Sequence, residues 1–293
     1  DKVIADKKIW KRMLRNALTL GFNDNLVEIS IKRFSQADDG LWTRLRSGKY
    51  DDLIFDIEDQ DKKRIKLHED RLMATIAFTD LKFVMQNTLS DIGAPVAAKF
   101  KTDGRFGISE ILCNLHDLDD IRHCWLILKS LASFSLPEKP LFCEIGAGYG
   151  GLSTKLRNNL PKARFVIIDL PEVNAVQTYY LSKVFPNDTI LGLRDFRLLG
   201  TEILKENFDF LILPASTIKE LFKKQEVDVF INIRSMMEMN NITLKFYFDT
   251  IQSSLKELGI FVCFNRYVKQ VGTFLNRFDE YPFDKNWKII SSR

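Results

Sequence analysis

Two acidic residues, each in or at the end of an apolar run, carry the clearest chemical signal in the sequence. Glu144 lies in the run LFCEIGAGYGG (residues 141–151), just before a series of glycines, and Asp169 closes a second apolar run, RFVIID. A carboxylate that closes such a second run can accept hydrogen bonds from both hydroxyls of a ribose. The two runs therefore predict a nucleotide-type pocket.

The glycines predict a sharp turn between a strand and a helix. They occupy positions 146, 148, 150 and 151, and Leu152, Leu156 and Leu160 then recur at helical spacing. Glycine lets the backbone turn sharply and approach a ligand closely. The N-terminus of the following helix offers free N–H groups and the positive end of the helix dipole.

Glu144 distinguishes two classes of cofactor. Gly146, Gly148 and Gly151 fit the dinucleotide pattern G-x-G-x-x-G, which alone is a weak signal. A carboxylate repels a pyrophosphate, whereas it attracts the sulfonium and ammonium groups of S-adenosylmethionine, which has no phosphate. We therefore favour S-adenosylmethionine over a nicotinamide cofactor. The alternative is that Glu144 is a helix-capping or surface acid.

Alternating strand and helix patterns predict the elements that position these residues. Strands are expected at 141–145, 164–169, 208–213, 227–233 and 260–265, and helices at 151–160, 172–184, 216–224 and 242–258. This alternation predicts an α/β domain over residues 137–293 with a Rossmann-like, doubly wound and mainly parallel sheet. A last strand is expected at 287–291 or within 266–281.

A mainly helical region, residues 1–136, is expected to precede that domain. Residues 3–20 show helical spacing with a basic opposite face, which suits either a packed arm or peripheral contact of residues 1–20 with an anionic membrane. Helices are expected at 64–89 and 109–133, the second beginning at Ser109. Between them, residues 91–110 contain three glycines and a proline and predict an irregular loop, either a lid or a connection.

Histidines and aspartates gather in the second of these helices. His116 and Asp120 form an i, i+4 pair, and the same stretch contains Asp117, Asp119 and His123. A divalent metal would need further ligands that the sequence does not place, so no metal site is expected. The other interpretations are an acid/base role for His116 and a solvated helix face.

Composition limits the partners of the protein. The net charge of +4 is concentrated in residues 1–16, which hold six basic and two acidic residues, and the remaining chain holds 37 of each. A balanced body argues against a generic nucleic-acid binder. No apolar run approaches the roughly 20 residues of a membrane span. The four cysteines lack C-x-x-C spacing and indicate free thiols in a reducing, cytoplasmic compartment. The sequence specifies no oligomeric state.

The sequence resembles class I S-adenosylmethionine-dependent methyltransferases over residues 141–265, where E-I-G-A-G-Y-G is similar to their first motif. A narrower resemblance, to the sugar O-methyltransferase family, covers about residues 90–293. It rests on EIGAGYGGL, VIIDLPEV with a downstream YYLSK, FINIRSMMEMN and FNRY. The resemblance implies an S-adenosylmethionine-dependent O-methyltransferase that acts on a sugar or glycan hydroxyl.

The resemblance also implies which residues contact the cofactor. They are Glu144, Gly146, Gly148, Tyr149, Gly150, Asp169, Leu170 and Asn232. Residues 213–216 would lie beside the adenine, where Pro214 and Ala215 suit a close backbone approach, and Asp195 is an alternative polar partner. The segment from Asn232 to Met239 would hold the acceptor near the methyl group.

Methyl transfer to a hydroxyl requires a positioned nucleophile and a base that removes its proton. Glu238 is the first candidate base, provided that it is shielded from water so that its pKa rises. His116 is the second, because its ordinary pKa suits the role. Arg234 suits an acidic sugar, a sugar phosphate or a lipid-linked phosphate. Arg105, with Phe106, could contact the substrate from the loop 91–110.

Other functions remain open at this point. An enzyme that methylates amino groups of nucleic acid would carry an Asn- or Asp-Pro-Pro-aromatic run after the fourth strand. The segment here is Ile231-Asn232-Ile233-Arg234, without proline. The remaining alternatives are a methyltransferase acting on another small molecule and a non-catalytic scaffold that binds S-adenosylmethionine.

Overall fold

The computed structural model describes residues 62–88, 98–101, 110–113 and 115–291 of the 293-residue chain. At its centre lies a six-stranded sheet in the order β5-β6-β4-β3-β7-β8, in which every neighbouring pair is parallel. The strands are β3 (Leu141–Ile145), β4 (Arg164–Asp169), β5 (Ile190–Leu191), β6 (Phe210–Pro214), β7 (Val227–Ile233) and β8 (Leu255–Phe264). The predicted Rossmann-like parallel sheet is therefore confirmed.

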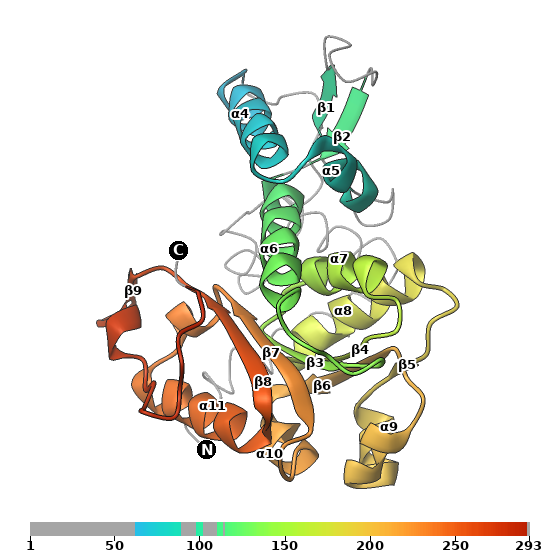
Figure 1. Cartoon of the computed structure of the whole chain (residues 1–293), viewed down its shortest axis with the longest axis vertical. Coiled ribbons are helices and arrows are strands. Elements are labelled where there is room, and N and C mark those ends of the chain that lie inside the picture. The colour runs from blue at the N-terminus through green and yellow to red at the C-terminus, as the bar shows by residue number, and fades with distance from the viewer. Residues whose placement is uncertain (1–61, 89–97, 102–109, 114, 292–293) are drawn as a thin grey trace, which may run out of the picture.

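The order of the strands reverses at β3. From β3 the chain moves outward to β4 and on to β5 and β6, and then returns to the other side of β3 to form β7 and β8 (Figure 1). In open α/β sheets, ligands bind beyond the carboxyl ends of the strands at such a reversal. The glycine turn that follows β3 lies at this point.

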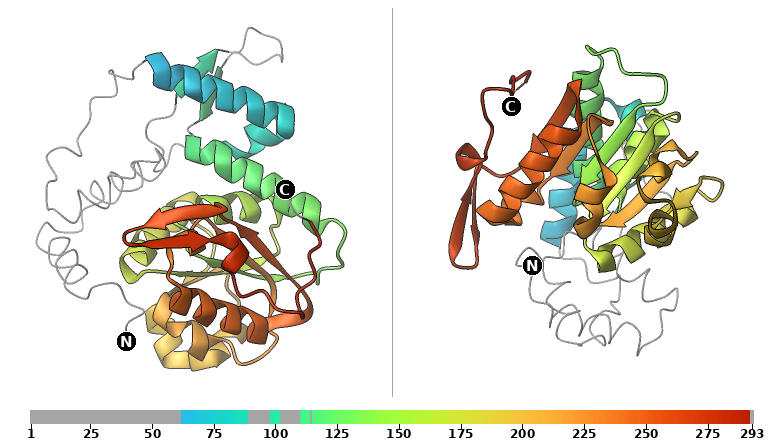
Figure 2. Two further views of the ribbon diagram at one scale, coloured as in Figure 1. Left: turned by 90° about the vertical axis from the view of Figure 1, so that its left-hand side faces the viewer. Right: turned by 90° about the horizontal axis from the view of Figure 1, so that it is seen from below.

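Helices cover both faces of the sheet (Figures 1 and 2). On one face lie α6 (Leu115–Leu131), α7 (Gly151–Asn159) and α8 (Pro171–Val184), and on the other α9 (Leu193–Leu199), α10 (Ile218–Leu221) and α11 (Asn241–Ser254). Successive strand residues pack on opposite faces of the sheet. Phe142 lies in the hydrophobic cluster with α6 to α8, and Cys143 lies in the cluster with α9 to α11. Because both faces are buried, the strands read as continuous apolar runs. Short 3-10 helices span Gly200–Lys205 (η2), Ala215–Thr217 (η3), Met236–Glu238 (η4) and Phe278–Glu280 (η5).

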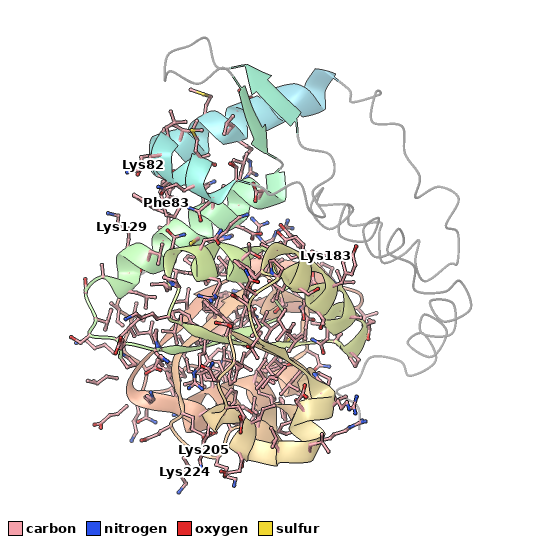
Figure 3. The ribbon with its side chains drawn as sticks, turned by 90° about the vertical axis from the view of Figure 1, so that its right-hand side faces the viewer. Lys82, Phe83, Lys129, Lys183, Lys205 and Lys224 are labelled. Carbon is pink, nitrogen blue, oxygen red and sulfur yellow. The ribbon has the colours of Figure 1, made fainter. Side chains whose placement is uncertain are left out.

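The helix expected at 64–89 is two helices, α4 (Lys62–Phe78) and α5 (Leu81–Asn87). The break has a local cause. Asp80 has an extended backbone, and its carboxylate accepts a hydrogen bond from the N–H of Phe83 at 2.7 Å, which caps a new helix. Phe83 of α5, labelled in Figure 3, packs against α6, where its ring meets that of Trp125 edge to face with 4.8 Å between the ring centres. The labelled lysines in Figure 3 are exposed.

The expectation of an irregular loop at 91–110, followed by a helix from Ser109, was partly wrong. Strands β1 (Ala98–Lys101) and β2 (Glu110–Cys113) pair antiparallel, and α6 begins only at Leu115. Pairing of backbone groups over 110–113 takes precedence over the helical pattern there. Arg105 and Phe106, like residues 1–20, lie outside the described residues.

The helix α6 packs in the same hydrophobic cluster as the sheet. Leu118 and Ile121 lie with Phe142 of β3, and Leu72 of α4 joins them. No described helix is long and apolar enough to cross a membrane.

The strand expected at 287–291 is not formed. Trp287 packs against the rings of Phe248 and Phe261 instead of extending the sheet. The alternative range, 266–281, contains the antiparallel hairpin of β9 (Val268–Val271) and β10 (Phe274–Arg277), which is separate from the six-stranded sheet. Likewise, α11 ends at Ser254 and not at 258, because Leu255 already pairs with Val227 of β7.

Candidate functional site

The turn after β3 has the conformation that its glycines predict. Gly146, Gly148 and Gly150 have φ angles of 73°, 59° and 96°, a region that L side chains rarely adopt. The N–H of Gly146 donates to the carbonyl of Ile168 at 2.8 Å, which joins the turn to β4. A Cβ at Gly146 would collide with Ser235, whereas a Cβ at Gly148 would meet nothing within 4 Å. One side of the turn is therefore packed and the other is open to a ligand.

Asp169 connects the turn to β4 and α8. Its Oδ2 accepts hydrogen bonds from the N–H of Gly148 at 3.2 Å and from Nε2 of Gln177 at 2.9 Å. Its Oδ1 accepts from the N–H of Leu170 at 2.8 Å. Burial raises the pKa of this carboxyl to about 7 in spite of these bonds. The side chain is thus held at the carboxyl end of β4 beside the glycines, and Leu170 next to it is exposed.

Glu144 is buried, with 3% of its surface exposed, which excludes a surface acid. Its Oε2 accepts a hydrogen bond from the Ser153 hydroxyl in the first turn of α7 at 2.5 Å. Burial raises its pKa to about 7, the Ser153 bond opposes this shift and the Asp169 carboxylate adds to it. Two acidic groups beneath the turn, on adjacent strands, therefore favour a cation placed above them.

The carboxyl end of β6 lies next to Asp169. Pro214 pairs with Asp169 in the sheet and is buried, and Ala215 begins the 3-10 helix η3 with partial exposure. Asp195 is the third residue of α9, and its Oδ2 accepts from the N–H of Gly192 at 2.8 Å. Pro214 and Ala215 thus lie beside the end of β4, whereas the Asp195 carboxylate caps its own helix.

Asn232 of β7 is fully buried. Its Nδ2 donates to the carbonyl of Ile145 at 2.8 Å and to Oγ of Ser235 at 2.5 Å. Its Oδ1 accepts from the N–H of Met236 at 3.2 Å and from Nδ2 of Asn265 at 2.9 Å. The amide therefore holds β3 and the loops after β7 and β8 together, and in this conformation it exposes no surface to a ligand.

The residues predicted from the sequence to act in catalysis or substrate binding have different settings in the structure. Glu238 lies in η4, is 59% exposed and forms an ion pair with Lys269 at 2.5 Å, so the shielding from water required of a base is not present. Arg234 follows β7 with a positive φ of 63° and pairs with Asp119 of α6 at 3.0 Å. His116 lies in the first turn of α6, but its side chain, like Arg105, is outside the described residues.

A buried charge cluster between α6 and α7 was not expected from the sequence. Nζ of Lys155 lies 2.5 Å from Asp117, and both side chains are at most 2% exposed. Tyr149 of the glycine turn is 4% exposed and hydrogen-bonds to Asp120, so its side chain points into this cluster. Burial raises the pKa of Asp120 well above its ordinary value. The i, i+3 spacing of Asp117 and Asp120 was visible, but lysine is usually exposed, and nothing indicated that Lys155 faces them.

His123 was also missed as a site residue. Its ring lies 5.2 Å from that of Phe264, the last residue of β8. Burial, and next the Arg234 guanidinium, lower its pKa to about 4, so the imidazole is neutral at pH 7. The i, i+4 spacing from Asp119 was the available signal, because it places both residues on one helix face.

No protein-family model and no curated protein matches the sequence. The structure is similar to geranyl diphosphate C-methyltransferase from Streptomyces coelicolor A3(2), with 16% identity, 50% of this chain and 43% of that chain covered, and a TM-score of 0.35. It is also similar to coclaurine N-methyltransferase, with 12% identity, 87% and 57% covered, and a TM-score of 0.35. For precorrin-6y C5,15-methyltransferase from Geobacter metallireducens GS-15 the values are 17%, 45%, 58% and 0.31. The chain spans about half the length of these proteins.

Proposed function

We propose that this protein is an S-adenosylmethionine-dependent methyltransferase that acts on a hydroxyl of a sugar or glycan. One observation carries the proposal: the open glycine turn at the strand reversal lies beside two carboxyl groups with raised pKa, the buried Glu144 and the partly buried Asp169. A cationic cofactor stabilises the ionised form of both groups, whereas the pyrophosphate of a dinucleotide would add two further negative charges there. This charge balance favours a sulfonium cofactor over a dinucleotide.

In this proposal, each element of the turn has a separate task. Backbone groups of Gly146, Gly148 and Gly150 line the cofactor, and Asp169 accepts the ribose hydroxyls. Pro214 and Ala215 flank the adenine, for which Asp195 remains the alternative partner. Tyr149 and Asn232 take positioning roles, because their side chains are buried. Glu144 acts through its charge from beneath the turn.

When bound, S-adenosylmethionine would supply an electrophilic methyl group. The protein must then place the acceptor oxygen in line with it and remove the proton of the hydroxyl. Glu238 and His116 are the sequence-based candidates for this base, and the exposure of Glu238 weakens the case for it. The sugar acceptor, the contact through Arg105, the boundary at residue 136 and a cytoplasmic location rest on the sequence.

The test is a calorimetric titration of the full chain with S-adenosylhomocysteine and, separately, with NAD. We expect micromolar binding of the first and none of the second. Asp169→Ala should weaken binding by roughly 1–3 kcal/mol, the range for losing a charged hydrogen-bond partner, and Glu144→Ala should also weaken it, because the ammonium group of the cofactor loses an opposite charge. Asp249→Ala is the control, because it removes an exposed carboxylate on α11. Binding of NAD instead, or unchanged affinity in both site variants, would overturn the proposal.

A second outcome separates an enzyme from a scaffold. Binding of S-adenosylhomocysteine without methyl transfer to any acceptor, across sugars, other small molecules and nucleic acid, would support the non-catalytic scaffold. Transfer to an acceptor other than a sugar would keep the methyltransferase and correct the substrate class.

A further inference from the structure

Three arginines gather near the carboxyl ends of β7 and β8, two of them on one aspartate and the third beside a histidine. They are Arg71 of α4, Arg122 of α6 and Arg234 after β7, and we call them, with Asp119 and His123 of α6, the arginine cluster. Positions 119, 122 and 123 lie on one side of α6, because they are spaced i, i+3 and i+4. The cluster thus joins three elements that are far apart in the sequence.

Asp119 holds two of the guanidinium groups in place. Its Oδ1 lies 3.0 Å from Nη1 of Arg71, and its Oδ2 lies 3.0 Å from Nη1 of Arg234. Asp119 is 16% exposed, whereas the two arginines are 45% and 47% exposed. A guanidinium has five N–H donors in a planar fork. Both arginines therefore keep donors that face outward.

Two buried polar atoms of the cluster have no hydrogen-bond partner within the described part of the chain. Nε of Arg122 and Nδ1 of His123 are buried, and neither has a hydrogen-bond partner among the residues that the structure describes. The rest of the Arg122 guanidinium lies over the ring of Phe78, 5.2 Å from its centre. Unpaired buried donors are costly, and such atoms in a native protein call for an explanation.

Among the residues that the structure describes, the charges of the cluster do not balance. Two guanidinium groups pair with one carboxylate, the third lies beside His123, and His123 is neutral at pH 7. Asp117 and Asp120, the nearest other acids of α6, are engaged with Lys155 and Tyr149 towards α7. A surplus of two positive charges, held by a fixed carboxylate, suits an oxyanion such as phosphate or carboxylate.

We propose that the arginine cluster binds an oxyanion group of the acceptor, so that the substrate is a sugar carrying a phosphate or a carboxylate. This inference rests on the proposed function and deepens it. Arg234 follows β7 and His123 packs on the end of β8, so the anion would be held at the same edge of the sheet as the glycine turn. An acceptor anchored there would lie at the edge of the sheet where the cofactor is proposed to bind.

His123 provides a spectroscopic reporter for this site. The chain has three histidines, so the imidazole signals in an NMR spectrum can be assigned with His123→Gln. Titration of the full chain with glucose 1-phosphate, with glucuronate and with glucose compares phosphate, carboxylate and a neutral sugar. We expect one or both anions, and not glucose, to raise the pKa of His123 from about 4 towards its ordinary 6.5, because the anion neutralises Arg234 and Arg122.

Two independent variants test the binding residues. Arg234→Gln and Arg71→Gln should each weaken binding of the effective anion by about tenfold or more, the effect of losing a charge-assisted hydrogen bond. Arg197→Gln removes an exposed arginine of α9 on the opposite face and should change nothing. Thermal melting of each variant checks that it folds.

The proposal is overturned if no anion shifts the His123 signal at millimolar concentration, or if both arginine variants bind as tightly as the native protein. Titration with S-adenosylhomocysteine separates this failure from that of the proposed function. Cofactor binding without an anion response removes only the subsite. An anion response without cofactor binding keeps the subsite and removes the methyltransferase.

Discussion

At the scale of single residues, two factors explain why the turn after β3 contains glycines: the backbone conformation and the space around each Cα atom. Three of its glycines have positive φ, but their surroundings differ: Gly146 faces Ser235 and Gly148 faces open space. The sequence motif does not distinguish between these glycines. Substitution by alanine should therefore separate strain of the backbone from collision of the side chain.

We predict that Gly148→Ala destabilises the protein by about 1–2 kcal/mol, the cost of a left-handed conformation for an L residue. Gly146→Ala should cost about 2–5 kcal/mol, because the collision with Ser235 adds to the same strain. Urea unfolding of both variants measures the difference. Equal losses of stability in the two variants would show that the loop after β7 moves aside at little cost. The packing of Ser235 against the turn would then contribute little to stability.

At the scale of elements, the contact between α6 and α7 rests on a buried ion pair. Lys155 lies among Asp117, Asp120 and Tyr180, all within the layer that covers the sheet. Tyr149 links the glycine turn to the same group through Asp120. The helix that leads into the sheet is thereby fastened to the helix that begins at the proposed cofactor turn.

We predict that Lys155→Met lowers the free energy of unfolding by about 3–5 kcal/mol, because it leaves carboxylates buried without their cation. Adding Asp117→Asn to that variant should restore part of the loss, since one uncompensated charge is removed. Chemical denaturation of the native protein and of the single and double variants forms the experiment. A single variant within about 1 kcal/mol of the native protein would contradict this account.

At the scale of the whole molecule, the buried carboxyl groups make stability depend on pH. Folding raises the pKa of Glu144 from 4.5 and that of Asp169 from 3.8, each to about 7. Between these values the folded state retains protons on both groups that the unfolded chain loses, and Asp120, whose pKa burial also raises, adds to this difference, so stability falls as pH rises. His123, whose pKa falls from 6.5 to about 4, acts in the opposite direction over part of this range.

The net effect is that the cofactor-free protein should lose stability between about pH 5 and 7, by at least about 1 kcal/mol per pH unit. Glu144→Gln removes one of these protons and should make the fall in stability shallower, most clearly below pH 6.5, where His123 acts against the remaining carboxyl groups. A cationic cofactor favours the ionised carboxylates, so its stabilising effect should be larger at pH 8 than at about pH 5.5. Unfolding curves at several pH values test this, and stability that rises from pH 5 to 7 would contradict it.

The sequence predicted the parallel sheet and the acidic pair at its carboxyl edge, because both leave local signals. Apolar runs mark strands buried on two faces, and clustered glycines mark a turn with positive φ. It missed the break at Asp80 and the start of α6 at Leu115, where a single cap and a strand pairing outweigh helical periodicity. The strand expected at Trp287 failed for a similar reason, since aromatic packing took precedence over pairing.

By itself, then, the sequence determined the fold class and the place of the candidate cofactor site. The tertiary structure decided which charged side chains meet. Lys155 faces Asp117, Glu238 faces solvent, and Asp119 bridges two arginines from distant elements. The reason is physical: periodicity records which face of an element is buried, but the partner of a buried charge is set by contacts between elements that sequence spacing does not contain.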